Sequence, residues 1–145
     1  MPFIRFYTSP GQLTAAEKQD LATVFTARYA KAMPAFFATV MFHEIPEDSY
    51  FVGGVKTEGT FVRLTMEHIA INFDREEKGD QMSKNFLAFV GEELKNRFES
   101  RGWRWEFNIL NTDKKYWRIQ GFEMPPLDSE TMKVWKTEQK ASAWQ

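Results

Sequence analysis

The feature that most constrains the fold of this 145-residue chain is an internal repeat. The opening segment Pro2–Phe6 (PFIRF) recurs as Thr60–Leu64 (TFVRL), and Glu17–Asp20 (EKQD) recurs as Glu77–Asp80 (EKGD). The first pair of segments alternates as strands do, and the second opens stretches with the apolar spacing of helices. The repeat therefore predicts two tandem strand–helix units.

The two units are predicted to have matching elements. In order they are strand 2–8, a helix from Thr14 to Pro34, strand 36–45, strand 50–52 leading to a Gly53-Gly54 hairpin or bulge, strand 61–69, a helix capped by Asp74 and ending before Gly102, strand 103–109, strand 116–119 and a short helix within 128–140. Thr14 and Glu17 have the spacing of a capping box, in which each side chain satisfies an N–H group at the helix start. The run at 36–45 is apolar on both faces, which predicts a central, fully covered strand.

These elements predict an α+β domain over residues 1–127, made of two β-α-β repeats at 2–58 and 59–121, with a C-terminal tail at 128–145. Two such units most easily form one four-stranded mixed sheet with both helices on one face and right-handed crossovers. Strands that are apolar on both sides cannot leave the second face bare in water. We therefore expect another subunit to cover that face, most simply in a closed ring.

Composition excludes several classes of protein. The net charge is −1, so nothing draws the chain to nucleic acid or to an anionic membrane. The chain contains no Cys, which removes thiol nucleophiles and zinc–thiolate sites, and its His43 and His68 are far apart in sequence. No apolar run is long enough to span a membrane, and no signal peptide opens the chain. We expect a cytoplasmic protein without a metal or another cofactor.

Pro2 is the residue with the most distinctive chemistry. Removal of Met1, which is usual before a small residue, would leave Pro2 with a free secondary amine. Desolvation beside Phe3, Ile4 and Phe6, or a nearby cation such as Arg5, would lower the pKa of that amine toward neutrality. It could then act as a general base or attack a carbonyl to form an iminium. An isolated proline at position 2 is, however, common by chance.

Several segments together resemble a known family. They are Pro2, Leu13-Thr14, Phe36–Pro46, Phe51–Val55, Glu67–Ala70, Trp105–Phe107 and Trp117–Ile119. In combination, over about residues 2–127, they resemble the tautomerase superfamily. The match is closest to the double-length group typified by cis-3-chloroacrylic acid dehalogenase and its oxalocrotonate tautomerase-like relatives. The resemblance implies β-α-β units, an N-terminal proline as catalyst and a homotrimer.

The positions that assist the proline in the dehalogenase differ here. The resemblance places Tyr29 where that enzyme has a His on its first helix, and Asn108 near the position of its Tyr. After the third strand this chain has His68, and the nearest Arg is Arg75, several residues later than the two Arg residues of the dehalogenase. The water-activating Glu falls near Ile119, an apolar residue. Hydrolytic dehalogenation is therefore not expected.

We predict Pro2, Tyr29 and His68 as catalytic residues, and Arg75, Asn108 and Arg118 as substrate-binding residues. A Tyr hydroxyl can hold an enolate oxygen, and a His titrates near neutral pH and can relay a proton. Arg118 is the preferred carboxylate binder because it follows Trp117 near the aromatic fourth strand, whereas Arg75 would lie in the first turn of a helix. Each residue also has a structural alternative, namely packing, a strand-end hydrogen bond or an ion pair between subunits.

Three functional hypotheses follow. In the first, the protein is a tautomerase-like enzyme in which Pro2 moves a proton in a small 2-oxo or enol carboxylic acid. In the second, the same fold is a non-catalytic, ligand-binding or structural oligomer, which retention of Met1 would indicate. In the third, the chain is a dimeric, ferredoxin-like α+β barrel with a cavity between sheet and helices and no special role for Pro2.

Overall fold

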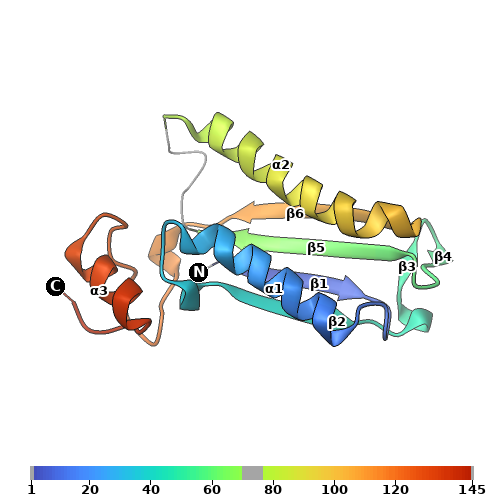
Figure 1. The fold of residues 1–145 in the computed structure, drawn as a ribbon, viewed down its shortest axis with the longest axis horizontal. Helices are drawn as coiled ribbons and strands as arrows, with labels where there is room; N and C mark the ends of the chain where they lie inside the picture. Colours follow the sequence, from blue (N-terminus) through green and yellow to red (C-terminus); the bar gives the residue numbers. More distant parts are fainter. Residues whose placement is uncertain (1, 70–76, 145) are drawn as a thin grey trace.

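A four-stranded mixed sheet with strand order β2-β1-β5-β6 forms the centre of the molecule. The computed structural model describes residues 2–69 and 77–144. The strands are β1 (Phe3–Thr8), β2 (Thr39–Glu44), β5 (Phe61–His68) and β6 (Arg104–Asn111). β1 runs parallel to β2 and β5 parallel to β6, while the central pair β1–β5 is antiparallel (Figure 1). The predicted pair of β-α-β units and the mixed sheet are confirmed.

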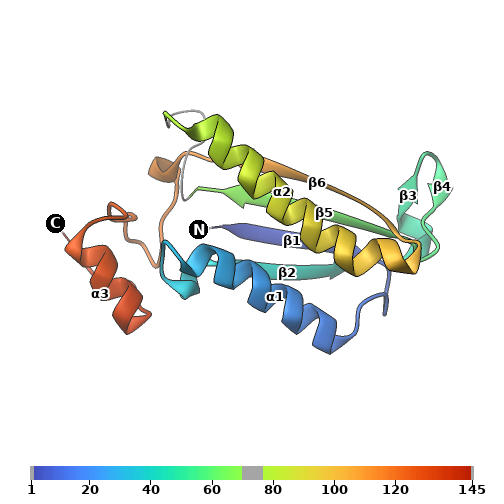
Figure 2. The ribbon, with the colours of Figure 1, turned by 45° about the horizontal axis from the view of Figure 1, so that its top comes forward.

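Helices α1 (Ala15–Ala30) and α2 (Gly79–Phe98) lie on the same face of the sheet (Figures 1 and 2). The capping box of α1 is present, because the Thr14 hydroxyl accepts from the Glu17 N–H at 3.2 Å and the Glu17 carboxylate accepts from the Thr14 N–H at 2.7 Å. The prediction that Asp74 caps α2 is wrong: the helix begins only at Gly79, and no side chain caps it. Asp74 itself lies outside the described residues.

The hydrophobic core fills the layer between the sheet and the two helices. Alternate residues of β1 and β5, such as Ile4, Phe6 and Leu64, point toward Phe25 of α1 and Val90 of α2, and all five are fully buried. Each such side chain contributes roughly 1.5–3 kcal/mol when it leaves water. Because the strand residues alternate, every second side chain must instead point to the helix-free face.

The position of β2 corrects one prediction. Residues 39–44 form an edge strand rather than a central one, and Met41 is 39 % exposed. His43 lies on the helix-free face, where it stacks on Tyr7 with ring centroids 5.1 Å apart. The preceding aromatic residues are not in the strand at all, because 35–37 form the 3₁₀ helix η1 (Ala35–Phe37).

Charged side chains occupy much of the helix-free face. Arg5 pairs with Glu67 at 2.5 Å, and Arg63 pairs with Glu106 at 2.8 Å and with the Asn108 side-chain oxygen at 2.5 Å. The expectation of an apolar second face is therefore wrong. This face instead mixes an ion-pair network with apolar positions, and exposed ion pairs of this kind contribute little to the stability of a single subunit.

The strand order also decides between two α+β folds. In a ferredoxin-like split β-α-β unit, another strand lies between the two strands that a helix connects. Here β1 and β2 are direct neighbours, as are β5 and β6. The ferredoxin-like alternative is therefore wrong.

The remaining elements lie at the ends of the sheet. The hairpin β3 (Phe51–Val52) and β4 (Val55–Lys56) turns at Gly53-Gly54, both with positive φ. Short 3₁₀ helices are η2 (Glu47–Ser49), η3 (Glu99–Arg101) and η4 (Lys114–Tyr116). The strand predicted at 116–119 is absent, since Ile119 makes only an isolated bridge with Phe122. Within the described residues, no helix is long and apolar enough to cross a membrane.

The C-terminal tail carries helix α3 (Glu130–Glu138), which lies near the end of the sheet where the chain begins (Figure 1). Ser129 caps the helix by accepting from the Met132 N–H at 3.1 Å. Met132 and Trp135 are buried, and the Trp135 ring packs near Phe37 with centroids 6.1 Å apart. The tail thus extends the hydrophobic core beyond the sheet.

Candidate active site

Pro2 lies at the start of β1 and is buried. Its carbonyl accepts a hydrogen bond from the Thr39 N–H at 3.0 Å, which fixes it beside the first residue of β2. Because β5 and β6 run antiparallel to β1 and β2, their last residues lie at this same end of the sheet (Figure 2). The end of the sheet therefore gathers the chain's start with the C-terminal ends of two strands.

The register of β1 and β5 brings Pro2 next to His68. Phe3 lies opposite Glu67 and Ile4 opposite Met66, so one step further along the same register sets Pro2 opposite His68. Opposed Cα atoms in antiparallel strands are about 4.5–5.5 Å apart. Ile4 and Met66, two residues further in, are both buried in the core. Pro2 and His68 therefore share the helix-covered face of the sheet.

Tyr29 completes this group from above. It lies in the last turn of α1 and continues the buried face of the helix that Leu21 and Phe25 begin, because the three residues are spaced four apart. Its hydroxyl forms a hydrogen bond of 3.0 Å with Nδ1 of His68, and only 4 % of each residue is exposed. Which atom donates follows from the histidine tautomer. When Nδ1 is unprotonated, the hydroxyl donates to it and Nε2 carries the proton.

The surroundings of Tyr29 are apolar. Burial raises the pKa of the Tyr29 hydroxyl well above its usual range, and the positive charge of Arg28 offsets only part of that effect. The Phe86 ring of α2 covers the pair, with its centroid 5.5 Å from that of Tyr29 and 5.1 Å from that of His68. The hydroxyl thus stays protonated at neutral pH and remains a hydrogen-bond donor in a dry environment.

The predicted substrate-binding residues do not join this group within one subunit. Asn108 pairs with Thr65 in the sheet register and lies on the helix-free face, where its oxygen accepts from Arg63. Arg118 follows β6, is 45 % exposed along its side chain and donates to Glu123 at 2.6 Å. Arg75 lies outside the described residues. The structure thus brings Pro2, Tyr29 and His68 together but leaves Asn108 on the other face.

Sequence reasoning missed two residues near this group. Asn111, the last residue of β6, lies opposite His68 in the register and shares its face, so it is the amide that the parallel pairing places there. Arg28 lies in the last turn of α1, with its guanidinium 5.7 Å from the centre of the Phe86 ring. A register count from the strand ends would have indicated Asn111. Arg28 could have been found from the sequence because it directly precedes Tyr29, a predicted catalytic residue.

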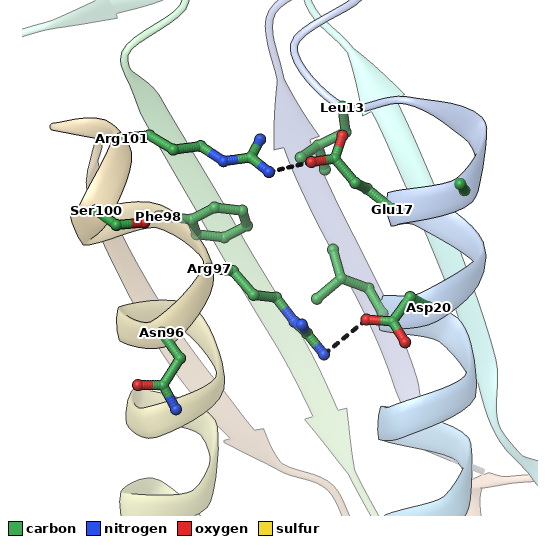
Figure 3. A pocket seen from close by; sticks show the side chains of 10 residues that line it. Leu13, Glu17, Asp20, Asn96, Arg97, Phe98, Ser100 and Arg101 are labelled. Carbon is green, nitrogen blue, oxygen red and sulfur yellow. Dashed lines mark hydrogen bonds and ion pairs between the residues drawn. The ribbon is translucent and has the colours of Figure 1, made fainter.

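A cavity of about 440 Å³ lies elsewhere, between the first turns of α1 and the last turns of α2 (Figure 3). Leu13 and Phe98 form part of its wall, and two ion pairs cross it, Arg97 to Asp20 at 2.9 Å and Arg101 to Glu17. No three His, Asp or Glu side chains of the described residues gather as a metal site would require.

Comparison with known proteins identifies the family. A family model described as "Putative oxalocrotonate tautomerase enzyme" matches residues 1–140. The chain belongs to this tautomerase family. A crystal structure from the thermophilic fungus Aspergillus fumigatus is 32 % identical, with a TM-score of 0.88 over 99 % of this chain and 98 % of that one. A comparison with curated proteins gave no match.

Two further structures place this tautomerase chain among its relatives. RhCC from Rhodococcus jostii RHA1 is 27 % identical, with a TM-score of 0.86 over 98 % of this chain and 99 % of that one. A member of the cis-3-chloroacrylic acid dehalogenase family is 12 % identical, with a TM-score of 0.71 over 94 % and 96 % of the two chains. At that identity the likeness concerns the fold alone.

Proposed function

We propose that this tautomerase-family protein moves a proton in a small 2-oxo or enol carboxylic acid, with the amine of Pro2 as its base. The observation that carries the proposal is the position of Pro2, buried at the start of β1 and opposite the hydrogen-bonded pair of His68 and Tyr29. An amine, an imidazole and a phenol at one dry end of a sheet are the groups that proton transfer next to a carbonyl requires.

The first step is assigned to Pro2. After removal of Met1, burial disfavours the charged form of the secondary amine and lowers its pKa toward neutrality. The neutral amine takes a proton from the enol oxygen or from the carbon next to the carbonyl, and the resulting ammonium returns that proton to the other atom. The substrate is thereby isomerised, with no net gain or loss of protons.

The second role is assigned to the Tyr29–His68 pair. During the transfer, negative charge develops on the carbonyl oxygen of the substrate, and a preorganised donor in a dry site stabilises that charge strongly. The Tyr29 hydroxyl is such a donor, because burial keeps it protonated. This role requires the histidine tautomer in which Nδ1 carries the proton: the Nδ1–H of His68 then donates to the Tyr29 oxygen across the 3.0 Å hydrogen bond, and the hydroxyl proton is left for the substrate oxygen.

The carboxylate of the substrate requires a cation at the same end of the protein. We assign this role to Arg118, which would exchange the carboxylate of Glu123 for that of the substrate, or to Arg75. Asn108 lies on the helix-free face, so it reaches a site only across an interface, in the homotrimer that we propose for this chain. Charge pairing on that face, from Arg5 to Glu67 and from Arg63 to Glu106, supports a polar interface between subunits.

The test is a keto–enol assay with phenylenolpyruvate, a small enol carboxylic acid, on the purified protein and on Pro2→Ala. A positioned general base contributes about 10²–10⁴-fold to a rate, so Pro2→Ala should lose about that factor. Mass spectrometry of the purified protein should show the loss of Met1, and 3-bromopropiolate should label Pro2 covalently.

Two outcomes would overturn this assignment. Full activity of Pro2→Ala would exclude the amine as the base, and retention of Met1 in protein isolated from its native cells would exclude a free amine altogether. The second result would favour the alternative of a non-catalytic oligomer with the same fold.

A further inference from the structure

Two cavities lined by residues of α1 and α2 differ in their charge: one is neutralised by ion pairs and the other is cationic. The first is the cavity of Figure 3, here called the paired cavity, at the first turns of α1. The second, here called the basic groove, has a volume of about 290 Å³ and is lined by Val24, Ala27, Arg28, Lys31 and Phe89.

In the paired cavity each arginine of α2 and η3 faces a carboxylate of α1. Figure 3 shows Arg97 pointing to Asp20 and Arg101 to Glu17 across the gap. Arg97 also pairs with Glu93 of its own helix at 3.1 Å. The cations of this cavity are thus neutralised within the protein, and it needs no charged ligand.

The basic groove lacks such neutralisation. Arg28 lies in the last turn of α1, and Lys31, three residues later, is the C-cap of that helix; like charges at that spacing repel each other. Val24 and Ala32, at helical spacing on either side of Arg28, are apolar. No carboxylate belongs to the lining of the groove in the described part of the chain. A third cation lies near, because the Lys136 ammonium donates to the Lys31 carbonyl at 3.3 Å.

The Arg28 guanidinium packs against two aromatic rings, but one of its hydrogen-bond donors has no acceptor among the described residues. Its guanidinium lies 5.7 Å from the centre of the Phe86 ring and 5.4 Å from that of Phe89. Its Nε is buried, and within residues 2–69 and 77–144 it has no hydrogen-bond partner. A buried donor left without an acceptor is costly, and such a group often marks the place of a ligand or a water.

From these observations we propose that the basic groove is a binding site for a small aromatic or aliphatic carboxylic acid. The carboxylate accepts from the Arg28 guanidinium, with Lys31 adding a second positive charge, and the apolar body of the acid packs on Phe89 and Val24. Arginine suits this role because its planar fork matches a carboxylate with two parallel hydrogen bonds. The lining of the groove does not include Pro2, Tyr29 or His68, so the site is distinct from that of Pro2.

The test measures binding of benzoate by titration calorimetry to the full-length protein and to Arg28→Met. The variant should bind at least about tenfold more weakly, since a charge-assisted hydrogen bond to the ligand is lost. The matched control is Arg97→Met, which removes an arginine from the paired cavity and should leave benzoate binding unchanged. Pro2→Ala should also bind normally, which separates this proposal from the proposed catalysis.

Three results would overturn the proposal: no benzoate binding to the unmodified protein, equal binding to Arg28→Met, or equal binding of inorganic sulfate and benzoate. Benzyl alcohol, which has the same ring without the charge, should not compete. If circular dichroism shows that Arg28→Met is unfolded, Arg28→Lys replaces it. Lysine keeps the charge but not the planar fork, so an intermediate loss of affinity is expected, and unchanged affinity would contradict the assigned geometry.

Discussion

The two ends of the central sheet are built alike but carry different side chains. At one end the Pro2 carbonyl accepts from the Thr39 N–H at 3.0 Å, and at the other the Thr60 carbonyl accepts from the Arg104 N–H at 2.8 Å. These bonds are equivalent in the two β-α-β units, since each joins the residue before one strand to the first residue of its parallel neighbour. Thr60 therefore occupies the position in the second unit that Pro2 occupies in the first.

The chemistry of the two positions differs completely. Thr60 is an internal residue whose nitrogen belongs to a peptide bond and donates to the Thr57 carbonyl at 3.0 Å. Pro2 faces His68, the last residue of β5. Thr60 faces the end of the shorter strand β1, which stops at Thr8 and contains no histidine. The last buried side chain of α1 is Tyr29, and that of α2 is Phe98, which has no hydroxyl.

This difference shows what a duplicated unit can and cannot copy. Strand order, helix packing and the backbone hydrogen bonds at the strand starts recur in both units. A free terminal amine occurs only once in a chain, so only one end of the sheet can use it. The second end is left to structural tasks, such as the ion pairs between α1 and the end of α2.

The largest expected effect comes from the C-terminal tail, because α3 packs against the Pro2 end of the sheet and not against the Thr60 end. Trp135 is fully buried among aromatic rings, so Trp135→Ala should lower the free energy of unfolding by about 3–5 kcal/mol. Denaturant unfolding monitored by circular dichroism measures this loss. The matched control is Val134→Ala, at a position that is 45 % exposed, with an effect within about 0.5 kcal/mol. A loss below about 1 kcal/mol for Trp135→Ala would mean that the tail is not part of the core.

Tyr29 and Phe98 are the last buried residues of α1 and α2, and exchanging their side-chain types tests whether a hydroxyl is required only at the Pro2 end of the sheet. Tyr29→Phe removes the hydroxyl that is hydrogen-bonded to His68 and should cost about 1–3 kcal/mol of stability, with a lower kcat in the keto–enol assay. Phe98→Tyr places a hydroxyl in a buried position and should also destabilise, without changing kcat. If Phe98→Tyr lowered kcat as much as Tyr29→Phe, the functional difference between the two ends would be refuted.

Much of the fold follows from local sequence signals. The capping box of Thr14 and Glu17 sets the start of α1, and Gly102 ends the segment after α2 with a φ of 71°, which glycine adopts without strain. The repeat of strand and helix segments predicts the two units. These signals act over a few residues, so the sequence alone displays them.

The properties that the sequence could not predict depend on distant neighbours. The run at 36–45 is apolar, but Phe36 and Phe37 serve the packing of Trp135, about a hundred residues later, and not a central strand. Asn108 was chosen for its amide, yet only the register with Thr65 reveals which face it occupies. Arg118 was chosen because it follows Trp117 near the aromatic fourth strand, and its pairing with Glu123 depends on a turn that no periodic pattern indicates.

The smallest expected effect on stability concerns Glu17, at the end of the sheet opposite Pro2. Its carboxylate takes part in the capping box of α1 and also pairs with Arg101. Its hydrogen bond with the Thr14 backbone, together with Arg101, lowers the pKa of Glu17 from 4.5 to about 2. Glu17→Gln should therefore reduce stability at pH 7 by about 0.3–1.5 kcal/mol. Because the folded-state pKa is depressed, this contribution is fully present above about pH 4.5 and is lost as the pH falls through about 2.

Chemical denaturation at a series of pH values checks this prediction, since the difference between Glu17→Gln and the unmodified protein should shrink across that window. Arg101→Met separates the two roles of the carboxylate. If the ion pair couples the units, the double variant should lose less stability than the sum of the single losses. Strict additivity would show that Glu17 acts only within α1, and that the far end of the sheet does not join the two units through this pair.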